Sequence, residues 1–217
     1  KDMHRLTLIM KKNYPDLPYV LIGHSMGSYM SRKYASIYGD ELDGVIFLGT
    51  GNQPKAVVDS GLKLAHIAKL VRGERYRSEL LNTIMFGAYN KRIKDNRTAN
   101  DWLTKDTKIV DEYLSDPKCS YKFTANAYIG FLNVIKYDID KKNIAKTPDK
   151  LPVLFASGLE DPVGDYGKGV KKAFKMYTKY VDNVELYLYE DDRHELHSET
   201  DREDIFSDLY EWIEENV

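Results

Sequence analysis

The sequence has only one cysteine, and this scarcity excludes one means of stabilisation. Because Cys119 has no second cysteine to pair with, the 217-residue chain can form no internal disulfide. That composition suits a reducing compartment, and we expect a cytoplasmic protein. Long apolar runs are also missing, since no stretch approaches the roughly 20 residues that a membrane-spanning helix needs.

The chain lacks a strong excess of charge of one sign. It has 32 basic and 34 acidic side chains, for a formal net charge of -2. A nucleic-acid-binding domain usually carries a basic excess, so we expect no nucleic-acid partner. Clusters with metal-ligand spacing are missing too, because His194 and His197 stand closer together than the histidines of the H-E-x-x-H zinc motif. We therefore expect no metal and no other cofactor.

One stretch carries a strong chemical signal. Residues 19–22 form a short apolar run, Gly23-His-Ser25-Met26-Gly27 follows, and a helical pattern comes next. A G-x-S-x-G sequence between a strand and a helix is typical of a nucleophile elbow. The tight turn strains the serine backbone and lifts the Ser25 hydroxyl above the strand end, with the Met26 N–H at a helix N-terminus where an oxyanion can bind. We expect a side chain at either flanking glycine to collide with its neighbours. The alternative is a glycine-rich turn with a surface serine.

A carboxylate and a histidine follow two later strand signals. Asp161 comes just after the apolar run at 152–156, with Asp165 as the alternative acid, and His194 comes a few residues after the alternating run at 184–189. The carboxyl ends of parallel strands meet at one edge of a sheet, so we expect these side chains to converge with the serine. A base held by a carboxylate can activate a hydroxyl nucleophile.

These motifs resemble a known family. The GHSMGS sequence, the G-L-E-D-P-V sequence around Asp161 and the order serine, aspartate, histidine resemble the α/β-hydrolase fold, and within it the monoacylglycerol lipase and lysophospholipase-like serine hydrolases. The resemblance implies a mostly parallel sheet with helices on both faces, and an ester hydrolase with Ser25, Asp161 and His194 as its catalytic triad. It also implies a second oxyanion-hole donor, besides the Met26 N–H, from strands that precede the elbow in the family. Related hydrolases include serine aminopeptidases, so an amide substrate is one alternative, and a non-catalytic module that keeps the fold is another.

The resemblance also suggests how the domain is divided. Strand signals stop near residue 51 and return near 149, and the patterns between them are helical. We predict two core parts, residues 1–50 with the elbow and residues 149–217 with the acid and the base. Residues 51–148 are then the helical cap that this fold inserts between strands.

Charge is unevenly divided between the cap and the core. Residues 51–148 hold 18 basic and 11 acidic side chains, a net charge of about +7. One interpretation is a lid that makes peripheral contact with anionic lipid surfaces, and the other is a solvated lysine-rich surface. We expect the first cap helix to bury a stripe that includes Val57, Gly61 and Leu64.

Four residues near the expected strand ends are candidates for substrate contact. Gly49 and Thr50 form a small-residue loop after the apolar run at 45–48, Val163 follows the acid, and His24 lies inside the elbow. We also expect His24 to hydrogen-bond a neighbouring loop. The predicted partner of this site is a small-molecule ester or a lipid.

Two terminal helices complete the prediction. Residues 1–13 have a helical pattern, with Leu6, Ile9 and Met10 as the expected buried face. Near the other end, Thr200-x-x-Glu203 is a capping-box sequence, which predicts the start of the last helix.

The elbow strand itself generates a prediction about association. An elbow strand normally lies inside a parallel sheet, and residues 19–22 contain no lysine, proline or bulge signal that would protect an edge. Because residues 1–13 are predicted to be helical, we expect a missing N-terminal segment, a clipped piece of it or a second copy beside this strand. The 217-residue chain made alone should aggregate or self-associate in sedimentation experiments. A monomer that unfolds cooperatively would contradict this prediction.

Overall fold

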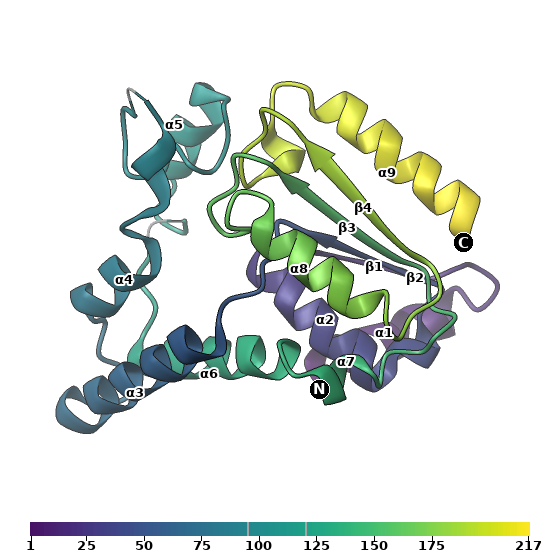
Figure 1. The fold of residues 1–217 in the computed structure, drawn as a ribbon, viewed down its shortest axis with the longest axis horizontal. Coiled ribbons are helices and arrows are strands. Elements are labelled where there is room, and N and C mark those ends of the chain that lie inside the picture. The colour runs from purple at the N-terminus through teal and green to yellow at the C-terminus, as the bar shows by residue number, and fades with distance from the viewer. Residues whose placement is uncertain (95, 120) are drawn as a thin grey trace.

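Four parallel strands form the centre of the molecule. The computed structural model describes residues 1–94, 96–119 and 121–217, and its sheet has the order β1-β2-β3-β4 (Figure 1). All three strand pairs are parallel. The strands are β1 (Val20–His24), β2 (Gly44–Leu48), β3 (Val153–Gly158) and β4 (Val184–Tyr189). Each strand coincides with one of the four segments predicted to be strands, which confirms the expected fold class.

Helices surround the sheet and extend beyond it. In Figure 1, α2 and α8 cover one face, α9 lies on the other, and α3 to α6 lie beyond the carboxyl ends of the strands. No helix within the described ranges is long and apolar enough to cross a membrane. The helices are α1 (Asp2–Asn13), α2 (Met26–Tyr38), α3 (Lys55–Arg72), α4 (Glu79–Phe86), α5 (Thr107–Ser115), α6 (Ala125–Asp138), α7 (Lys141–Ile144), α8 (Lys168–Tyr177) and α9 (Arg202–Asn216), with 3₁₀ turns η1 (Gly39–Glu41), η2 (Tyr89–Arg92) and η3 (Leu196–Ser198).

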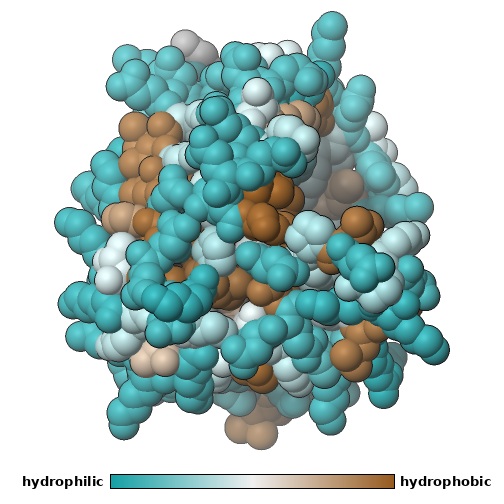
Figure 2. All heavy atoms as spheres, turned by 90° about the vertical axis from the view of Figure 1, so that its right-hand side faces the viewer, coloured by the Kyte–Doolittle hydropathy of each residue, from teal (hydrophilic) through white to brown (hydrophobic). Residues whose placement is uncertain are grey.

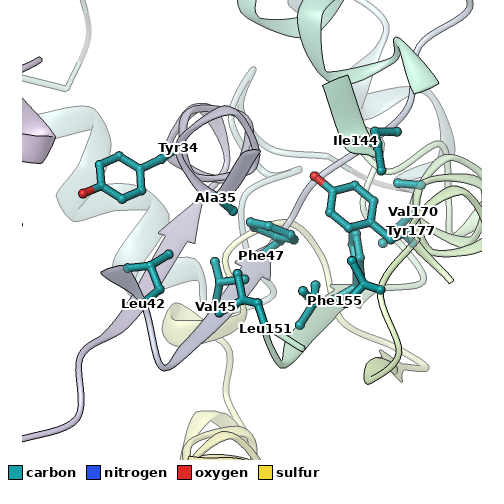
Figure 3. Close-up of a cluster of buried hydrophobic side chains, with 13 residues drawn as sticks. Tyr34, Ala35, Leu42, Val45, Phe47, Ile144, Leu151, Phe155, Val170 and Tyr177 are labelled. Carbon is teal, nitrogen blue, oxygen red and sulfur yellow. The ribbon is translucent and has the colours of Figure 1, made fainter. Parts of the chain in front are cut away.

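The two central strands are buried on both faces, as their continuous apolar sequences require. Phe47 of β2 and Phe155 of β3 point to one face, where they pack with Tyr177 of α8 (Figure 3). Their neighbours Ile46 and Leu154 point to the opposite face and pack under α9. Burial on both faces fixes the register of β2 and β3, and with it the positions of the loops that follow them.

The helices between β2 and β3 have a core of their own. Val58 and Leu62 of α3 pack against Leu132 of α6, and this cluster continues to Tyr29 of α2. The predicted stripe on α3 was wrong by one position, because Val57 is 60% exposed. The helix is apolar on more than one face, so periodicity alone did not identify the face that packs.

One edge of the sheet and part of α1 expose apolar side chains. Among the described residues β1 pairs only with β2, and Ile22 is half exposed. On α1 the predicted buried face was wrong, because Leu6 and Ile9 are exposed while Thr7 is buried and accepts a hydrogen bond from the Tyr34 hydroxyl. The face seen from the right of Figure 1 is mostly hydrophilic, with apolar atoms in separate patches (Figure 2).

The last helix begins differently from the prediction. Its N-cap residue is Asp201, and no side chain caps the helix, so the capping box of Thr200 and Glu203 does not form. Glu199, two residues before this N-cap, is fully buried and accepts the N–H groups of Lys105 and Arg193. The buried face of this helix consists of Ile205, Leu209 and Trp212.

The packing of α9 yields a prediction for stability. Trp212 is fully buried, and its Nε1 donates a hydrogen bond of 2.8 Å to Glu185 of β4. Trp212→Ala should lower the free energy of unfolding by about 3–5 kcal/mol, because it leaves a cavity and removes a hydrogen bond from the Glu185 carboxylate. The control Tyr210→Ala, on the exposed face of the same helix, should change it by no more than about 0.5 kcal/mol. Equal losses in urea titrations of the two variants would contradict the packing described here.

Candidate active site

The predicted elbow adopts a strained turn. Ser25 lies between β1 and α2 with φ 54° and ψ -121°, a conformation that non-glycine residues rarely adopt. Its N–H donates to the Leu48 carbonyl at the end of β2, and its carbonyl accepts the Ser28 hydroxyl at 2.6 Å. The turn is thus fixed from both sides, and the Ser25 side chain stays partly accessible.

The two glycines of the elbow have different roles. A Cβ at Gly23 would lie 2.3 Å from the Ser31 hydroxyl and 2.6 Å from the Gly27 carbonyl, so the predicted collision is confirmed there. At Gly27 a Cβ would meet no described atom within 4 Å, and the prediction for that glycine was wrong. The close approach of β1 to α2 is at Gly23, whereas Gly27 faces open space.

Three side chains from distant parts of the chain meet above the strand ends. The Ser25 hydroxyl lies 2.7 Å from Nε2 of His194, and Nδ1 of the same ring lies 3.0 Å from Oδ1 of Asp161. A carboxylate can only accept, so Nδ1 carries the proton and donates it to Asp161. Nε2 is then free to accept the hydroxyl proton of Ser25. This arrangement is a hydroxyl, an imidazole and a carboxylate joined by two hydrogen bonds.

Asp161 is held firmly in its loop. The carboxylate is fully buried, and its Oδ1 also accepts the Val163 N–H at 2.8 Å. Its second oxygen lies 3.4 Å from the Ser157 hydroxyl at the end of β3. The alternative acid, Asp165, is exposed and has no bond to His194. The structure therefore places Asp161, and not Asp165, beside His194.

His24 hydrogen-bonds the neighbouring loop, as predicted. Its Nε2 donates to the His194 carbonyl at 3.1 Å, and its ring lies 4.8 Å from the His194 ring and 4.7 Å from that of His197. Burial, together with the charges of the neighbouring His194 and His197 imidazoles, lowers the pKa of His24 to about 3. The ring is therefore neutral at pH 7 and adds no positive charge next to the base.

The other predicted contact residues lie in the loops that follow β2 and β3. A Cβ at Gly49, which has φ 56°, would lie 3.0 Å from the His194 ring, so only glycine lets the ring sit there. Thr50 is fully buried, with its hydroxyl 3.4 Å from the Arg32 guanidinium. Val163 is half buried against the cluster around Tyr29. These positions give Gly49 and Thr50 packing roles, and substrate contact at any of the four remains a proposal.

A buried arginine supports the loop after β2. The guanidinium of Arg32 on α2 donates to the Gly51 carbonyl at 2.8 Å and to the Asp138 carbonyl at 3.1 Å. Burial raises the pKa of the Asp138 carboxyl to about 8, and the nearby Arg32 only partly opposes this rise. This contact could not be predicted from the sequence, because Arg32 lies in an ordinary helical pattern.

Aromatic side chains pack beside His194, a contact that could not be predicted from the sequence. The Trp102 ring lies 5.0 Å from the His194 ring and 4.8 Å from Tyr89, and Arg92 stacks on Tyr166 of the acid loop at 3.6 Å. These contacts join the segment between β2 and β3 to both the base and the acid.

With this geometry established, comparison with known proteins decides the family. The family model described as "Serine aminopeptidase, S33" matches residues 1–201. The chain belongs to this family. It is an α/β-hydrolase of the serine-hydrolase type, related to monoglyceride lipases and esterases.

Individual relatives agree with this assignment. The monoglyceride lipase homolog of monkeypox virus is 22% identical over 215 residues, which are 98% of this chain and 69% of the relative. A thermostable carboxyl esterase from Bacillus coagulans, solved with glycerol, superposes with a TM-score of 0.91 at 28% identity, covering 99% of this chain and 70% of the esterase. For the fold alone, the monoglyceride lipase of Saccharomyces cerevisiae gives a TM-score of 0.71 at 21% identity, over 99% of this chain and 69% of that protein. The chain thus spans about 70% of the length of these relatives.

The unequal glycines of the elbow generate a prediction. Gly23→Ala should lower the free energy of unfolding by roughly 1–3 kcal/mol, because a methyl group there overlaps α2. Gly27→Ala, the matched control in the first turn of α2, should leave stability unchanged or raise it by up to roughly 1 kcal/mol, since alanine favours helix. Denaturant titration of both variants tests this difference. A larger loss in Gly27→Ala would contradict the elbow geometry.

Proposed function

We propose that the protein cleaves carboxylic esters of the monoacylglycerol or lysophospholipid type through an acyl-enzyme on Ser25. The observation that carries this proposal is the pair of hydrogen bonds that joins Ser25 to His194 and His194 to Asp161. A neutral imidazole within 2.7 Å of a serine hydroxyl is positioned to act as a general base. The carboxylate at Nδ1 keeps the required tautomer and stabilises the imidazolium that forms.

The proposed reaction has two halves. The Ser25 oxygen attacks the ester carbonyl while Nε2 of His194 takes its proton, and Nε2 then gives that proton to the departing alcohol. Water attacks the acyl-enzyme by the same path, losing its proton to Nε2, and the acid product leaves as Ser25 regains a proton. Asp161 stays ionised throughout and transfers no proton itself.

The strained turn at Ser25 presents a backbone N–H that could bind the negatively charged oxygen of the tetrahedral intermediate. Met26 is the first residue of α2, so its N–H has no acceptor within the helix. We assign this N–H as one donor of the oxyanion hole, where the helix N-terminus also favours negative charge. Losing one such donor typically costs about 2.7–4 kcal/mol in the transition state.

The proposed substrate class follows from the relatives and from the segment between β2 and β3. The relatives named above include monoglyceride lipases and an esterase solved with glycerol. We assign residues 51–148 as a cap that shapes the acyl pocket. Exposed apolar side chains lie on α3 among basic ones, including Ile67, Leu70 and Val71, which favours peripheral contact with anionic lipid surfaces.

An amidase is the second candidate, and the family description favours it. The name of the family is that of serine aminopeptidases, and the same triad chemistry cleaves amides. Rates on p-nitrophenyl esters of increasing chain length and on aminoacyl anilides separate the two functions. Faster cleavage of the anilides would replace the ester hydrolase with the amidase. Absence of both activities would favour a non-catalytic module.

Substitutions in the triad test the assigned roles. Ser25→Ala should abolish ester cleavage, and Asp161→Asn and His194→Ala should lower kcat by several orders of magnitude, on the order of 10⁴-fold for a misplaced tautomer. Asp165→Asn, a charge-matched control on the same loop, should keep nearly full activity because Asp165 is exposed. Wild-type activity in Ser25→Ala, or a larger loss in Asp165→Asn than in Asp161→Asn, would disprove the assignment.

A further inference from the structure

The loop that carries His194 is bound to the segment between β2 and β3. The His194 N–H donates to the Trp102 carbonyl at 3.4 Å, and the Glu195 N–H donates to the Leu103 carbonyl at 2.7 Å. The Arg193 guanidinium also donates a hydrogen bond of 2.7 Å to the Asp101 carbonyl of that segment. Residues 101–104 are buried along this contact. The base is therefore positioned by a segment about 90 residues earlier in the chain.

The buried carboxylate of Glu199 hydrogen-bonds both sides of this contact. Glu199 is fully buried, and its Oε1 accepts the Arg193 N–H at 2.8 Å, next to the base. Its Oε2 accepts the Lys105 N–H at 3.0 Å and lies 3.0 Å from the Thr104 hydroxyl. Each oxygen of a single side chain thus holds one of the two segments. No other residue type has two acceptor oxygens on a stem of this length.

The ammonium of Lys105 partly offsets the negative charge of the carboxylates around Glu199. Asp192, Glu199 and Asp201 bring carboxylate oxygens within 4.8 Å of one another. The ammonium of Lys105 bonds to Asp192 and lies 3.7 Å from Asp201, so a cation of the chain itself already occupies the cluster. This contact adds a second connection between residue 105 and the loop of the base. The cluster is therefore part of the same junction and not a separate site.

We propose that Glu199 is a positioning residue, which holds the His194 loop against residues 101–105 and so keeps the imidazole aligned with Ser25. The inference rests on the proposed serine-hydrolase function, because it concerns the alignment of the same base. Glu199 does not touch the reacting atoms. It acts through the backbone on both sides of the junction, while His24 holds the His194 carbonyl from the elbow.

Glu199→Gln is the test, with Glu203→Gln as its matched control on the exposed side of α9. An amide offers one acceptor oxygen, so its NH₂ group must face the Arg193 N–H or the Lys105 N–H, and one side of the junction opens. A displacement of about 1 Å at a catalytic group costs on the order of a hundredfold in rate. Glu199→Gln should therefore lower kcat by about that factor, with KM unchanged because no substrate contact is lost.

A second readout does not depend on catalysis. The proton on Nδ1 of His194, bonded to Asp161, gives a downfield proton resonance, which should shift or vanish in Glu199→Gln and remain in Glu203→Gln. Equal kcat and equal resonances in the two variants would overturn the proposal. If the wild type cleaves no ester, the proposed function fails, and the resonance alone decides whether Glu199 aligns the base.

Thr104→Val covers the case in which Glu199→Gln does not fold. It removes the Thr104 hydroxyl, which lies 3.0 Å from Oε2 of Glu199, 2.8 Å from the Ser198 carbonyl and 3.0 Å from the Asp106 N–H. It keeps both backbone donors to the carboxylate, at a buried position where valine has nearly the same shape. A folded Thr104→Val variant should show a several-fold lower kcat and a shifted resonance. A variant indistinguishable from Glu203→Gln in both readouts would overturn the proposal.

Discussion

The hydrogen bond from Nδ1 of His194 to Asp161 is the interaction on which the site depends. It decides which nitrogen of the ring carries the proton, and therefore whether Nε2 can accept the hydroxyl proton of Ser25. The three residues are far apart in the sequence, so their alignment requires that β1, β3 and β4 end at the same edge of the sheet. Burial of β2 and β3 on both faces fixes that edge, because a shift of one residue would expose their apolar side chains.

Positioning of the base involves more than the sheet. The His194 loop follows the edge strand β4, which has no strand on its outer side among the described residues. Instead it is bonded to residues 101–105 and covered by the ring of Trp102. The segment between β2 and β3 therefore contacts His194 itself through this junction, while α3 and α6 pack with α2 further away. Any change in that segment during substrate entry would act on the base through this junction.

The sequence predicted the parts that depend on local pattern. All four strands, the elbow and the convergence of Ser25, Asp161 and His194 followed from apolar runs that end in short polar loops. The errors concern long-range packing. The buried faces of α1 and α3 were wrong because both helices have apolar residues on more than one face. The role of Glu199 could not be predicted from the sequence either, because its partners at residues 104, 105 and 193 become its neighbours only in the folded structure.

The central claim is that Ser25 is a nucleophile activated by His194, and covalent labelling tests it most directly. The protein should react with a fluorophosphonate, and peptide mapping by mass spectrometry should place the adduct on Ser25 and on no other serine. The same reagent should label His194→Ala far more slowly, because its serine has no base within hydrogen-bond distance. An unlabelled wild type, or an adduct on another serine, would contradict this account.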